Sequence, residues 1–599
     1  MCGFIGKISN SNINTENIVE CNKKIICRGP DNTTVFESRN NQINFNSKKH
    51  YSFIFNRLSI QDLTELANQP MYSKEFNSLI LFNGEIFNHE DLRKELLSKG
   101  LRFKTKNSDT EVLLLGISYF GKKYLNKIIG QFSIVFIDFG NNRLIMAKDR
   151  FSQKPLFYKL NPDELVFGSN LESVYRATDN NIISDENLHE YIQSSVIKSP
   201  NTIFHNIFKL RPSEIIEIDI GNKIKIIDKS IYWEIDNYVD EKKFNKDEFF
   251  TLMFDAIQIR NRADVEVASF CSGGIDSTAI IKSLNETNEN INTFTVKFKN
   301  KKYDESHWSN QVAKKYNTNH FVEVLDSNIK LQQIDDVINN LDELYGDPSL
   351  IPTNIISKVM SKKYKVALSG DGGDELFGGY IHFNNLIKNK KYNQNLISQI
   401  YKFYNPKRGS GTEILSRSSK LQIAHASYFN DYKLLELLGI NQVKPFLNND
   451  NLVGNEKKYI QIRDYKFYLT EMMMLKVDRA SMANSLEVRS PFVDHRLVEY
   501  VLAHNFYENN IYSSKNLLKE YLSEDFSKEF LNREKKGFAF DVENWININK
   551  ETVIETFFYG TYIKKYNKNI FKELNQYKSR INGIRIWKLY LLEKYLERF

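Results

Sequence analysis

Cysteine is scarce in this sequence, and its scarcity excludes a disulfide-stapled fold. The 599 residues contain only Cys2, Cys21, Cys27 and Cys271, whereas disulfide scaffolds are short, cysteine-dense secreted chains. Cys21 and Cys27 lack the two-residue spacing of a zinc knuckle and have no His pair close by, so they do not indicate a zinc site. So few cysteines fit a reducing compartment, and we expect a cytoplasmic protein.

The sequence also lacks the long apolar run of a membrane span and the charge excess of a nucleic-acid-binding protein. No run approaches the roughly 18 apolar residues that a span needs, and Lys7, Ser9 and Asn10 interrupt the opening before a signal peptide could form. The 82 basic and 74 acidic residues leave a net charge of +8, dispersed in mixed runs. We therefore expect no membrane and no nucleic-acid partner.

Residues 1 to about 180 alternate in the manner of short strands separated by Asn, Gly and Pro. The strand-like runs cover residues 51–55, 79–82, 132–138, 143–147 and 164–167. Residues 89–97 and 109–125 instead place Leu and Ile at three- and four-residue spacing, which predicts helices. The pattern predicts antiparallel sheets with helices packed outside them.

From about residue 245 the pattern changes. Apolar runs at 265–270, 293–298, 320–324 and 365–368 alternate with helical patterns, which predicts βαβ units and a parallel sheet. Beyond residue 385 strands nearly vanish, and residues 472–476, 517–518 and 587–596 indicate helices. A hairpin is predicted at Gly221-Asn222. We predict a first domain at 2–215, a connector at 216–245 and a second domain at 246–599.

The most informative single residue is Cys2. Removal of Met1 would leave a thiol and a free α-amine on one residue, which is the nucleophile-and-base pair of N-terminal nucleophiles. The amine titrates near 8, so a useful fraction can accept the thiol proton near neutral pH. Taken alone, a cysteine at this position is more often an inert small residue, and its meaning depends on the residues that follow.

Several motifs follow Cys2 in an order that resembles class II glutamine amidotransferases, which have the N-terminal-nucleophile fold, an αββα sandwich. They are Cys2-Gly3, the run Arg28-Gly29-Pro30-Asp31, and residues 56–60, 83–89 and 108–111. Taken singly, Asn83-Gly84 reads as a turn and Arg57 as a surface ion pair. Their combination with Cys2 favours a glutaminase.

The resemblance implies a role for each residue of this set. Cys2 would attack the side-chain amide of glutamine, and Asn83 with Gly84 would donate hydrogen bonds to the resulting oxyanion. Arg57 would bind the carboxylate of glutamine and Asp109 its ammonium. Ile60 and Glu85 belong to the same glutamine site.

Two glycine-rich loops indicate a nucleotide site. Residues 272–277, Ser-Gly-Gly-Ile-Asp-Ser, stand between a strand-like run and a helical stretch, where backbone amides can cradle phosphate. No Gly-Lys-Ser/Thr follows, so the loop is not a Walker motif; it resembles the pyrophosphatase loop of N-type ATP pyrophosphatases. Residues 368–380 form the second cluster, again after a strand-like run.

The resemblance assigns this nucleotide site its ligands. Carboxylates at the ends of two parallel strands can share Mg²⁺ bound to pyrophosphate, and Asp276 and Asp374 match the metal-binding acids. ATP would contact the following set: Ser272, Gly273, Gly274, Asp276, Ser277, Phe298, Ser369 and Gly370.

With the motifs at 476–483, 487–494 and 533–538, nearly the whole chain resembles the glutamine-hydrolysing asparagine synthetases. That resemblance implies ATP and Mg²⁺ as cofactors, glutamine and aspartate as substrates, and a homodimer. It assigns Lys535 to catalysis, where it would neutralise charge on the acyl-adenylate and leaving phosphate. Asp371 stands where many members carry Glu, which shifts the general base by one methylene. Cys271 replaces the usual aliphatic residue, and we expect a buried small side chain.

Three alternatives stay open. The same mechanism could amidate another carboxylate, such as a uronic acid of a surface polysaccharide. A non-catalytic paralogue could serve as a binding protein, although the intact site residues argue against it. A cyclising ligase of the β-lactam synthetase kind shares the fold but needs no glutaminase, so the complete first set of motifs disfavours it.

Overall fold

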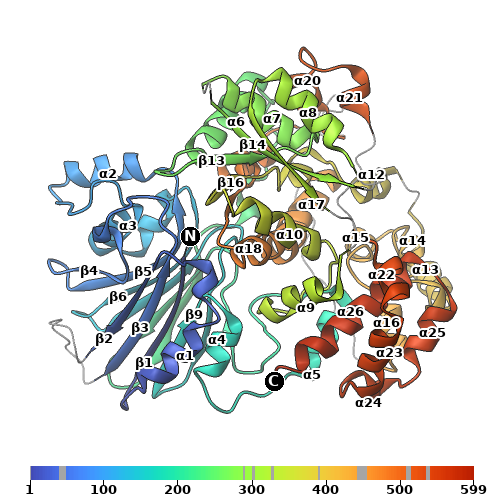
Figure 1. Ribbon diagram of the computed structural model, residues 1–599, viewed down its shortest axis with the longest axis horizontal. Helices are drawn as coiled ribbons and strands as arrows, with labels where there is room; N and C mark the ends of the chain where they lie inside the picture. Colours follow the sequence, from blue (N-terminus) through green and yellow to red (C-terminus); the bar gives the residue numbers. More distant parts are fainter. Residues whose placement is uncertain are drawn as a thin grey trace.

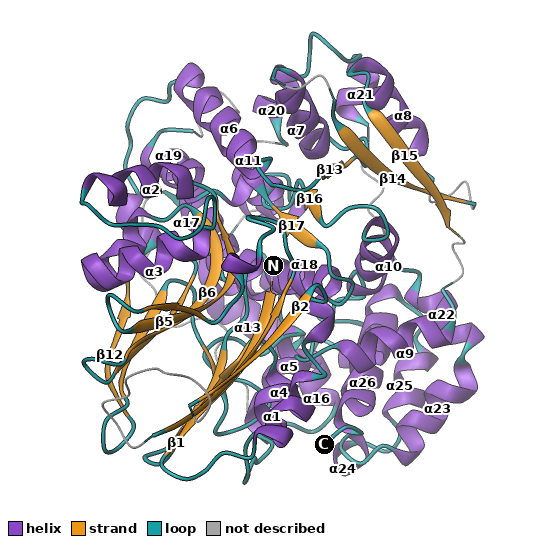
Figure 2. Cartoon of the chain, turned by 60° about the vertical axis from the view of Figure 1, so that its left-hand side comes forward, coloured by secondary structure: helices purple, strands orange, loops and turns teal. Residues whose placement is uncertain are grey.

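The fold is taken from a computed structural model of the whole chain. It describes residues 2–38, 49–287, 290–299, 304–325, 329–388, 391–441, 455–506, 514–533 and 540–599. Both views show antiparallel sheets on one side, a parallel sheet above them and a mass of helices at the other side (Figures 1 and 2).

The N-terminal part contains two six-stranded antiparallel sheets. The first has the order β10 (Phe208–Lys209), β8 (Phe157–Leu160), β9 (Glu164–Gly168), β1 (Cys2–Ser9), β3 (His50–Arg57), β2 (Asn32–Glu37). The second has the order β12 (Lys225–Ile231), β11 (Glu214–Asp219), β7 (Arg143–Lys148), β6 (Gly130–Asp138), β5 (Ser78–Ile86), β4 (Met71–Ser73). The helices of this part are α1 (Thr15–Asn22), α2 (His89–Ser98), α3 (Asp109–Phe120), α4 (Leu171–Arg176) and α5 (Asp185–Ser194).

Side-chain alternation along the strands produces the αββα layers. Successive residues of a strand face opposite sides: Phe4 of β1 joins the core between the two sheets, whereas Ile5 faces the layer that contains α1 and α4. In β5, Leu81 faces the inter-sheet core and Ile80 packs under α2 and α3. The predicted sandwich is therefore present, and the predicted helices at 89–97 and 109–125 lie on its outer face.

The predicted connector, residues 216–245, is not a free linker over its whole length. The expected hairpin at Gly221-Asn222 is present as β11 and β12, and β11 pairs with β7 of the second sheet. Strand pairing thus draws the chain into the N-terminal sandwich as far as Ile231, because hydrogen bonds along β7 would otherwise be left without partners.

The second part is built on a five-stranded parallel sheet. Its order is β15 (Asn319–Leu325), β14 (Asn292–Phe298), β13 (Val267–Phe270), β16 (Val366–Leu368), β17 (Glu487–Arg489), and all four pairings are parallel. The sequence predicted the first four strands. It did not predict β17, because three residues are too few for an alternating or apolar pattern to be visible.

Helices surround the parallel sheet and fill the C-terminal end. Those near the sheet are α6 (Lys246–Arg260), α7 (Ile275–Asn285), α8 (Ser306–Lys315), α9 (Leu331–Asn340), α10 (Leu350–Met360), α11 (Gly373–Phe377) and α12 (Ile381–Lys388). Then come α13 (Gln394–Lys402), α14 (Thr412–Leu415), α15 (Leu421–Ala426), α16 (Tyr432–Leu437), α17 (Glu456–Arg463), the π-helix η6 (Asp464–Met473), α18 (Met474–Met482) and α19 (His495–Ala503). The last group is α20 (Asn516–Tyr521), α21 (Lys528–Asn532), α22 (Val542–Ile548), α23 (Lys550–Tyr559), α24 (Ile563–Tyr566), α25 (Ile570–Gln576) and α26 (Arg580–Leu596).

The two parts share one hydrophobic core. Tyr191 and Ile192 of α5 belong to the same buried cluster as Trp587 and Tyr590 of α26, and the Tyr191 hydroxyl donates to the Lys588 carbonyl at 3.0 Å. Figure 1 shows α26 beside α5 near the C-terminus. No described helix is both long and apolar enough to cross a bilayer.

Candidate functional site

The cysteine site lies where β1, β3 and β5 meet. Cys2 opens β1 directly opposite Arg57 at the end of β3, and its backbone nitrogen donates to Asn83 Oδ1 at 3.2 Å. Antiparallel pairing brings Cys2 next to Arg57, and the packing of the two sheets brings it next to Asn83, 81 positions away in the sequence. The predicted neighbours of Cys2 therefore surround it, and a small cavity of about 30 Å³ lies beside the thiol.

Asn83 offers a donor that nothing in the described structure uses. Its Nδ2 is buried with no hydrogen-bond partner among the described residues, and an unpaired buried donor is costly unless a ligand accepts from it. At the next position, a methyl group on Gly84 would lie 2.1 Å from the Gln131 carbonyl oxygen. Only glycine fits there, because a larger side chain would collide with the backbone of β6 beside the Asn83 position.

Arg57 is buried and its guanidinium holds the loop that follows it. NH1 donates to the Thr64 carbonyl at 2.8 Å and to Asn68 Oδ1 at 2.9 Å, and NH2 donates to the carbonyls of Gln61 and Asp62. The residue lines the same cavity as Cys2. It is not the surface ion pair that a lone arginine suggests; it shapes the wall of the pocket.

Two buried carboxylates face the cysteine pocket, and their charges are only partly compensated. Burial raises the pKa of Glu85 well above its usual value, which Arg489 opposes from 3.2 Å away. Burial also raises the pKa of Asp109, with His89 acting against it. Asp109 accepts a hydrogen bond from the Ile86 amide at 3.1 Å and has no ion pair among the described residues. It can therefore receive a cationic group of a ligand.

The thiol itself is protonated at rest. Burial raises the pKa of the Cys2 thiol above its usual value, so the thiolate that attacks an amide has to be produced by a nearby base. The α-amine that removal of Met1 would expose is carried by the same residue.

The first glycine-rich loop joins β13 to α7 at the edge of the parallel sheet. Gly273 has φ +69, and a methyl group there would lie 2.7 Å from Trp308 Cβ, so glycine is required. The Ser272 hydroxyl accepts from the Gly274 amide at 3.1 Å. The loop leads straight into the N-terminus of α7, an arrangement that favours anions.

The second loop packs directly on the first. A methyl group on Gly370 would lie 2.7 Å from Asp276 Cβ, so the glycine permits the close approach. Ser369 Oγ donates to Asp371 Oδ2 at 2.6 Å, and Gly372 adopts φ +88 just before α11. The structure therefore brings the predicted nucleotide residues of both loops to one place.

Asp276 and Asp374 converge on a lysine that the sequence did not single out. Lys515 Nζ lies 2.5 Å from Asp276 Oδ2 and 2.6 Å from Asp374 Oδ1. Asp276 Oδ1 is buried and has no hydrogen-bond partner among the described residues. Nothing in the sequence around Lys515 links it to an aspartate 239 positions earlier.

These carboxylates fit a divalent cation. Both aspartates face the Lys515 ammonium, and Asp276 Oδ1 has no hydrogen-bond partner among the described residues. These carboxylate oxygens are the kind of ligand that Mg²⁺ prefers. A cation held there would carry the charge of bound phosphates. Lys515 occupies that position in the structure.

A cavity of about 410 Å³ opens beside both loops. One end is formed by α10, α18 and the 369–372 loop, and it carries the side chains of Asp371 and Lys476. The only polar contact given by the Lys476 ammonium is with Met473 Sδ at 3.7 Å, and neither Asp371 nor Lys476 has an ion pair among the described residues. Two opposite charges thus face one cavity without neutralising each other.

The two parts of the chain meet at a seam rich in buried charge. Arg28 donates to both carboxylate oxygens of Asp478, at 2.8 and 2.9 Å, and Arg479 reaches Asp342 at 2.9 Å. Although burial raises the pKa of Asp478, Arg28 and Lys154 hold it below its usual range, so the carboxylate stays charged. We predicted no role for Asp478 from the sequence, because no local pattern connects it with Arg28.

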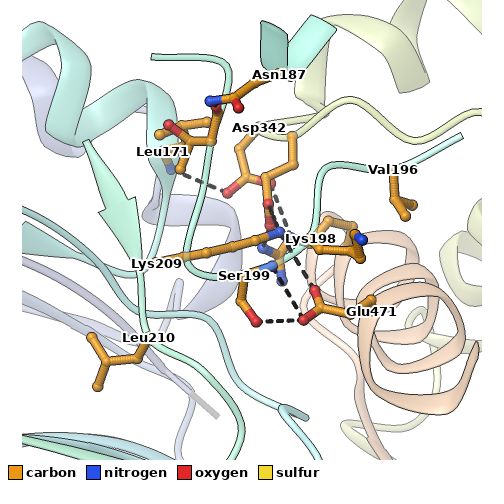
Figure 3. Close-up of polar contacts among 12 residues, drawn as sticks. Leu171, Asn187, Val196, Lys198, Ser199, Lys209, Leu210, Asp342 and Glu471 are labelled. Atoms are coloured by element: carbon orange, nitrogen blue, oxygen red, sulfur yellow. Dashed lines mark hydrogen bonds and ion pairs between the residues drawn. The ribbon is translucent and has the colours of Figure 1, made fainter. Parts of the chain in front are cut away.

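Figure 3 shows the middle of this seam, where Lys209 of β10 points at the second part of the chain. Its ammonium lies 2.5 Å from Glu343 and 3.9 Å from Glu471. Ser199 donates to Glu471, and the Leu171 amide donates to Asp342 at 3.1 Å. The first part of the chain is therefore fixed to the second through specific, buried pairs.

Apolar contacts join the two sites as well. Leu58 and Ile60, which line the Cys2 cavity, pack against Val366 and Met482. Val366 begins β16, which ends at Leu368, one residue before Ser369 of the second loop. The pockets lie on either side of one short strand.

Two predicted residues are not placed by their side chains. Lys535 lies outside the described residues. Phe298 ends β14, but its side chain also lies outside what the structure describes. Cys271 is 1% exposed and burial raises its pKa to about 12, which confirms the prediction of a buried small side chain.

Fold and sites together define a two-part protein in which an N-terminal-nucleophile αββα unit precedes a parallel-sheet nucleotide unit. The asparagine synthase family matches residues 249–564, and the glutamine amidotransferase domain family matches residues 1–233. The chain belongs to the asparagine synthase family. It is thus a carbon–nitrogen ligase with an amidotransferase domain, of a family that uses ATP.

Characterised relatives cover most of the chain. Asparagine synthetase [glutamine-hydrolyzing] 1 of Bacillus subtilis is 28% identical, over 94% of this chain and 92% of its own length. Asparagine synthetase [glutamine-hydrolyzing] 3 of the same organism is 28% identical over 79% of this chain and 76% of its own. Amidase chry2 of Gibberella zeae is 23% identical over 84% of this chain and 82% of its own.

Proposed function

We propose that the protein converts aspartate to asparagine with ATP and with ammonia released from glutamine. The products are asparagine, glutamate, AMP and pyrophosphate. The first part of the chain supplies ammonia and the second part activates the acceptor carboxylate. Family membership fixes the reaction type but not the acceptor, since one relative carries the name amidase.

In the first part, the Cys2 α-amine takes the thiol proton and the thiolate attacks the side-chain amide of glutamine. Asn83 Nδ2 and the Gly84 amide donate to the oxyanion as the carbonyl becomes tetrahedral. Ammonia leaves with the proton returned by the amine, and water hydrolyses the thioester to glutamate. Asp109 holds the substrate ammonium, and Arg57 with Ile60 and Glu85 forms the pocket around it.

In the second part, the acceptor carboxylate attacks the α-phosphate of ATP, giving a β-aspartyl-AMP and pyrophosphate. The loops at 272–277 and 369–370 hold the nucleotide through backbone amides and the start of α7. Asp276 and Asp374 would hold Mg²⁺, which would supply positive charge opposite the pyrophosphate, and we assign Lys535 to the same role. Ammonia then attacks the acyl-adenylate and AMP leaves, with Asp371 as the candidate base.

Ammonia has to cross from Cys2 to the acyl-adenylate without being protonated by bulk water. We infer a route past Leu58 and Ile60 towards the end of β16. Support comes from their contact with Val366 and Met482, which makes an apolar layer between the two pockets. The buried pairs of the seam keep that layer closed.

The observation that carries the choice of aspartate is the pair of uncompensated charges at Asp371 and Lys476. An α-amino acid presents an ammonium and a carboxylate, and these complement a carboxylate and an ammonium on the protein. A uronic acid has no ammonium to satisfy Asp371. The rival acceptor therefore leaves the Asp371 carboxylate of the cavity without a cationic partner.

An acceptor screen tests this choice. Pyrophosphate and glutamate are measured with ATP, Mg²⁺ and glutamine while aspartate, glucuronate and other carboxylates are added in turn. Aspartate should stimulate pyrophosphate release and yield asparagine by mass spectrometry. Stimulation by a uronic acid but not by aspartate would overturn the acceptor, and glutamine hydrolysis without pyrophosphate from any acid would favour a non-catalytic second part.

Lys476→Met provides the matched test of the cavity. We expect the KM for aspartate to rise by about tenfold or more, since an interaction with a charged group contributes about 1.5–3 kcal/mol, with the KM for ATP unchanged. Lys358→Met, on the exposed face of the neighbouring helix α10, should leave both values as they are.

A further inference from the structure

Three metal-ligating side chains meet outside both pockets. His382 is the second residue of α12, His425 lies in α15, and Asp464 opens the π-helix η6. His425 Nε2 lies 2.7 Å from Asp464 Oδ1, and His382 Nε2 lies 3.0 Å from Asp464 Oδ2. One donor atom from each residue lies within 4.8 Å of the other two.

The cluster is buried and protected. His425 is fully buried and the His382 side chain is 11% exposed. The rings of Tyr380, Tyr428 and Phe429 lie within 5.2 to 5.4 Å of the His382 ring. Bulk water therefore competes little for these donors.

We propose that His382, His425 and Asp464 form a Zn²⁺ site. Two imidazoles and one carboxylate are a common protein ligand set for zinc, with bonds of about 2.0–2.2 Å. Tetrahedral bonds of that length separate ligand atoms by roughly 3.3 Å. The separations of 2.7 and 3.0 Å need to open by only a few tenths of an ångström. The partial exposure of His382 leaves a fourth position for water.

The site would tie together three segments that are far apart in the chain. His382 lies two residues after Tyr380, which lines the nucleotide cavity and stacks on the His382 ring at 5.2 Å. The π-helix η6 begins at Asp464 and carries Glu471 near its other end. Glu471 accepts a hydrogen bond from Ser199 at the seam. Zinc here holds the wall of the nucleotide cavity in place; it does not take part in the reaction.

Metal analysis of the full-length protein tests the site. The chain is produced without a histidine tag in medium containing zinc, dialysed, and its zinc content is measured by plasma mass spectrometry. We expect about one zinc per chain in the wild type, little in Asp464→Asn and His382→Asn, and wild-type content in His189→Gln. His189 is a part-buried histidine whose ring contacts Tyr566, far from the three proposed ligands in the sequence.

Cobalt substitution keeps the proposal falsifiable if the variants fold poorly. Wild-type protein loaded with Co²⁺ should show the visible d–d bands of a tetrahedral ion, without the thiolate charge-transfer band that cysteine ligands produce. If the wild type binds no stoichiometric zinc and Co²⁺ gives no such bands, the three residues form a hydrogen-bonded triad only and the proposal is wrong. Equal zinc content in Asp464→Asn and the wild type would also overturn it.

Discussion

The cysteine pocket and the nucleotide cavity are built on opposite plans. The first has a volume of about 30 Å³ and is built on strands, with Cys2 and Arg57 held by the register of β1 and β3 and Asn83 supplied by β5 of the facing sheet. The second has a volume of about 410 Å³ and is lined by loops and helix ends at the edge of a parallel sheet. Hydrolysis of one small amide needs fixed donors, whereas ATP and an acceptor need space.

The two regions also differ in how they treat charge. The cysteine pocket contains a carboxylate, Asp109, without an ion pair in the described structure, and the nucleotide site contains two carboxylates neutralised by Lys515. The cysteine pocket can therefore bind a cationic group of its substrate. The other holds a substitute cation that a metal–phosphate complex has to displace.

The largest effect should come from Cys2→Ala. Removal of the nucleophile should lower glutamine-dependent synthesis by about 10⁴-fold, while ammonia-dependent synthesis stays within about twofold. Glutamate and asparagine are quantified with each nitrogen source. Cys21→Ala, which changes another buried thiol, is the control. Survival of both reactions in Cys2→Ala would show that the thiol is not the nucleophile.

Lys515→Gln should sharpen the difference in charge. Without the lysine, the buried carboxylate of Asp276 and the partly exposed carboxylate of Asp374 repel each other, so the variant should unfold at a lower temperature. Mg²⁺ without nucleotide should restore much of this loss in the variant and have little effect on the wild type. Thermal unfolding with and without Mg²⁺ measures both.

Lys519→Gln is the matched control for that experiment, because Lys519 lies one turn further along α20 and contacts Asn532 at 3.3 Å. It should show no Mg²⁺ dependence of its own. If Mg²⁺ raises the melting temperature of Lys515→Gln no more than that of the wild type, Asp276 and Asp374 do not form the metal site.

Asp478→Asn should uncouple the two regions. The variant removes the charge that Arg28 and Lys154 face, so the seam loosens and ammonia escapes before it reaches the acyl-adenylate. We expect the ratio of glutamate to asparagine formed to rise by a few fold, with glutamine hydrolysis retained. Lys365→Met breaks the exposed pair with Asp31 across the same seam and should leave the ratio unchanged, because exposed pairs contribute little. An unchanged ratio in Asp478→Asn would remove the seam from ammonia transfer.

The smallest effect concerns Lys588, whose ammonium donates to the Ile192 carbonyl at 2.7 Å between the two parts. Burial lowers its pKa to about 8. The folded state therefore releases the proton near pH 8 while the unfolded chain keeps it to about 10.4, so stability from this group rises with pH between those values.

Lys588→Met should reduce the rise with pH without abolishing it, because burial also lowers the pKa of Lys148 to about 8, and it should change stability at pH 7 by only about 1 kcal/mol. Urea unfolding midpoints at pH 7 and at about pH 9.5 give the comparison, with Lys594→Met, a partly exposed lysine of the same helix, as the control. A rise of the same size in Lys588→Met and the wild type would show that Lys588 does not contribute to it.

Local patterns predicted the parts of the fold that repeat. The short strand-like runs before residue 180 predicted antiparallel sheets with helices outside them, and the strand–helix alternation after residue 245 predicted the parallel sheet; the αββα arrangement followed from the family resemblance. They missed β17, which is held in place by pairing with β16 rather than by a pattern of its own. They also placed the end of the first domain at residue 215, before the edge strand β12, which is joined to the sheet through β11.

For the sites, sequence motifs identified residues that act through their neighbours in the chain. Asn83-Gly84 and the two glycine-rich loops belong to this kind. Lys515, Lys476 and the Arg28–Asp478 pair could not be predicted, because each depends on a partner or a cavity formed by distant segments. Folding in three dimensions, not spacing, creates those contacts.

The hydrophobic core that passes from α5 into α26 has a practical consequence. A fragment ending near residue 245 would bare Tyr191 and Ile192, together with the other apolar side chains that α26 covers. Exposed patches of that kind cause self-association. Excising either catalytic half for separate expression would thus give sticky material rather than an independent enzyme, and the amidotransferase is better silenced by point mutation than by truncation.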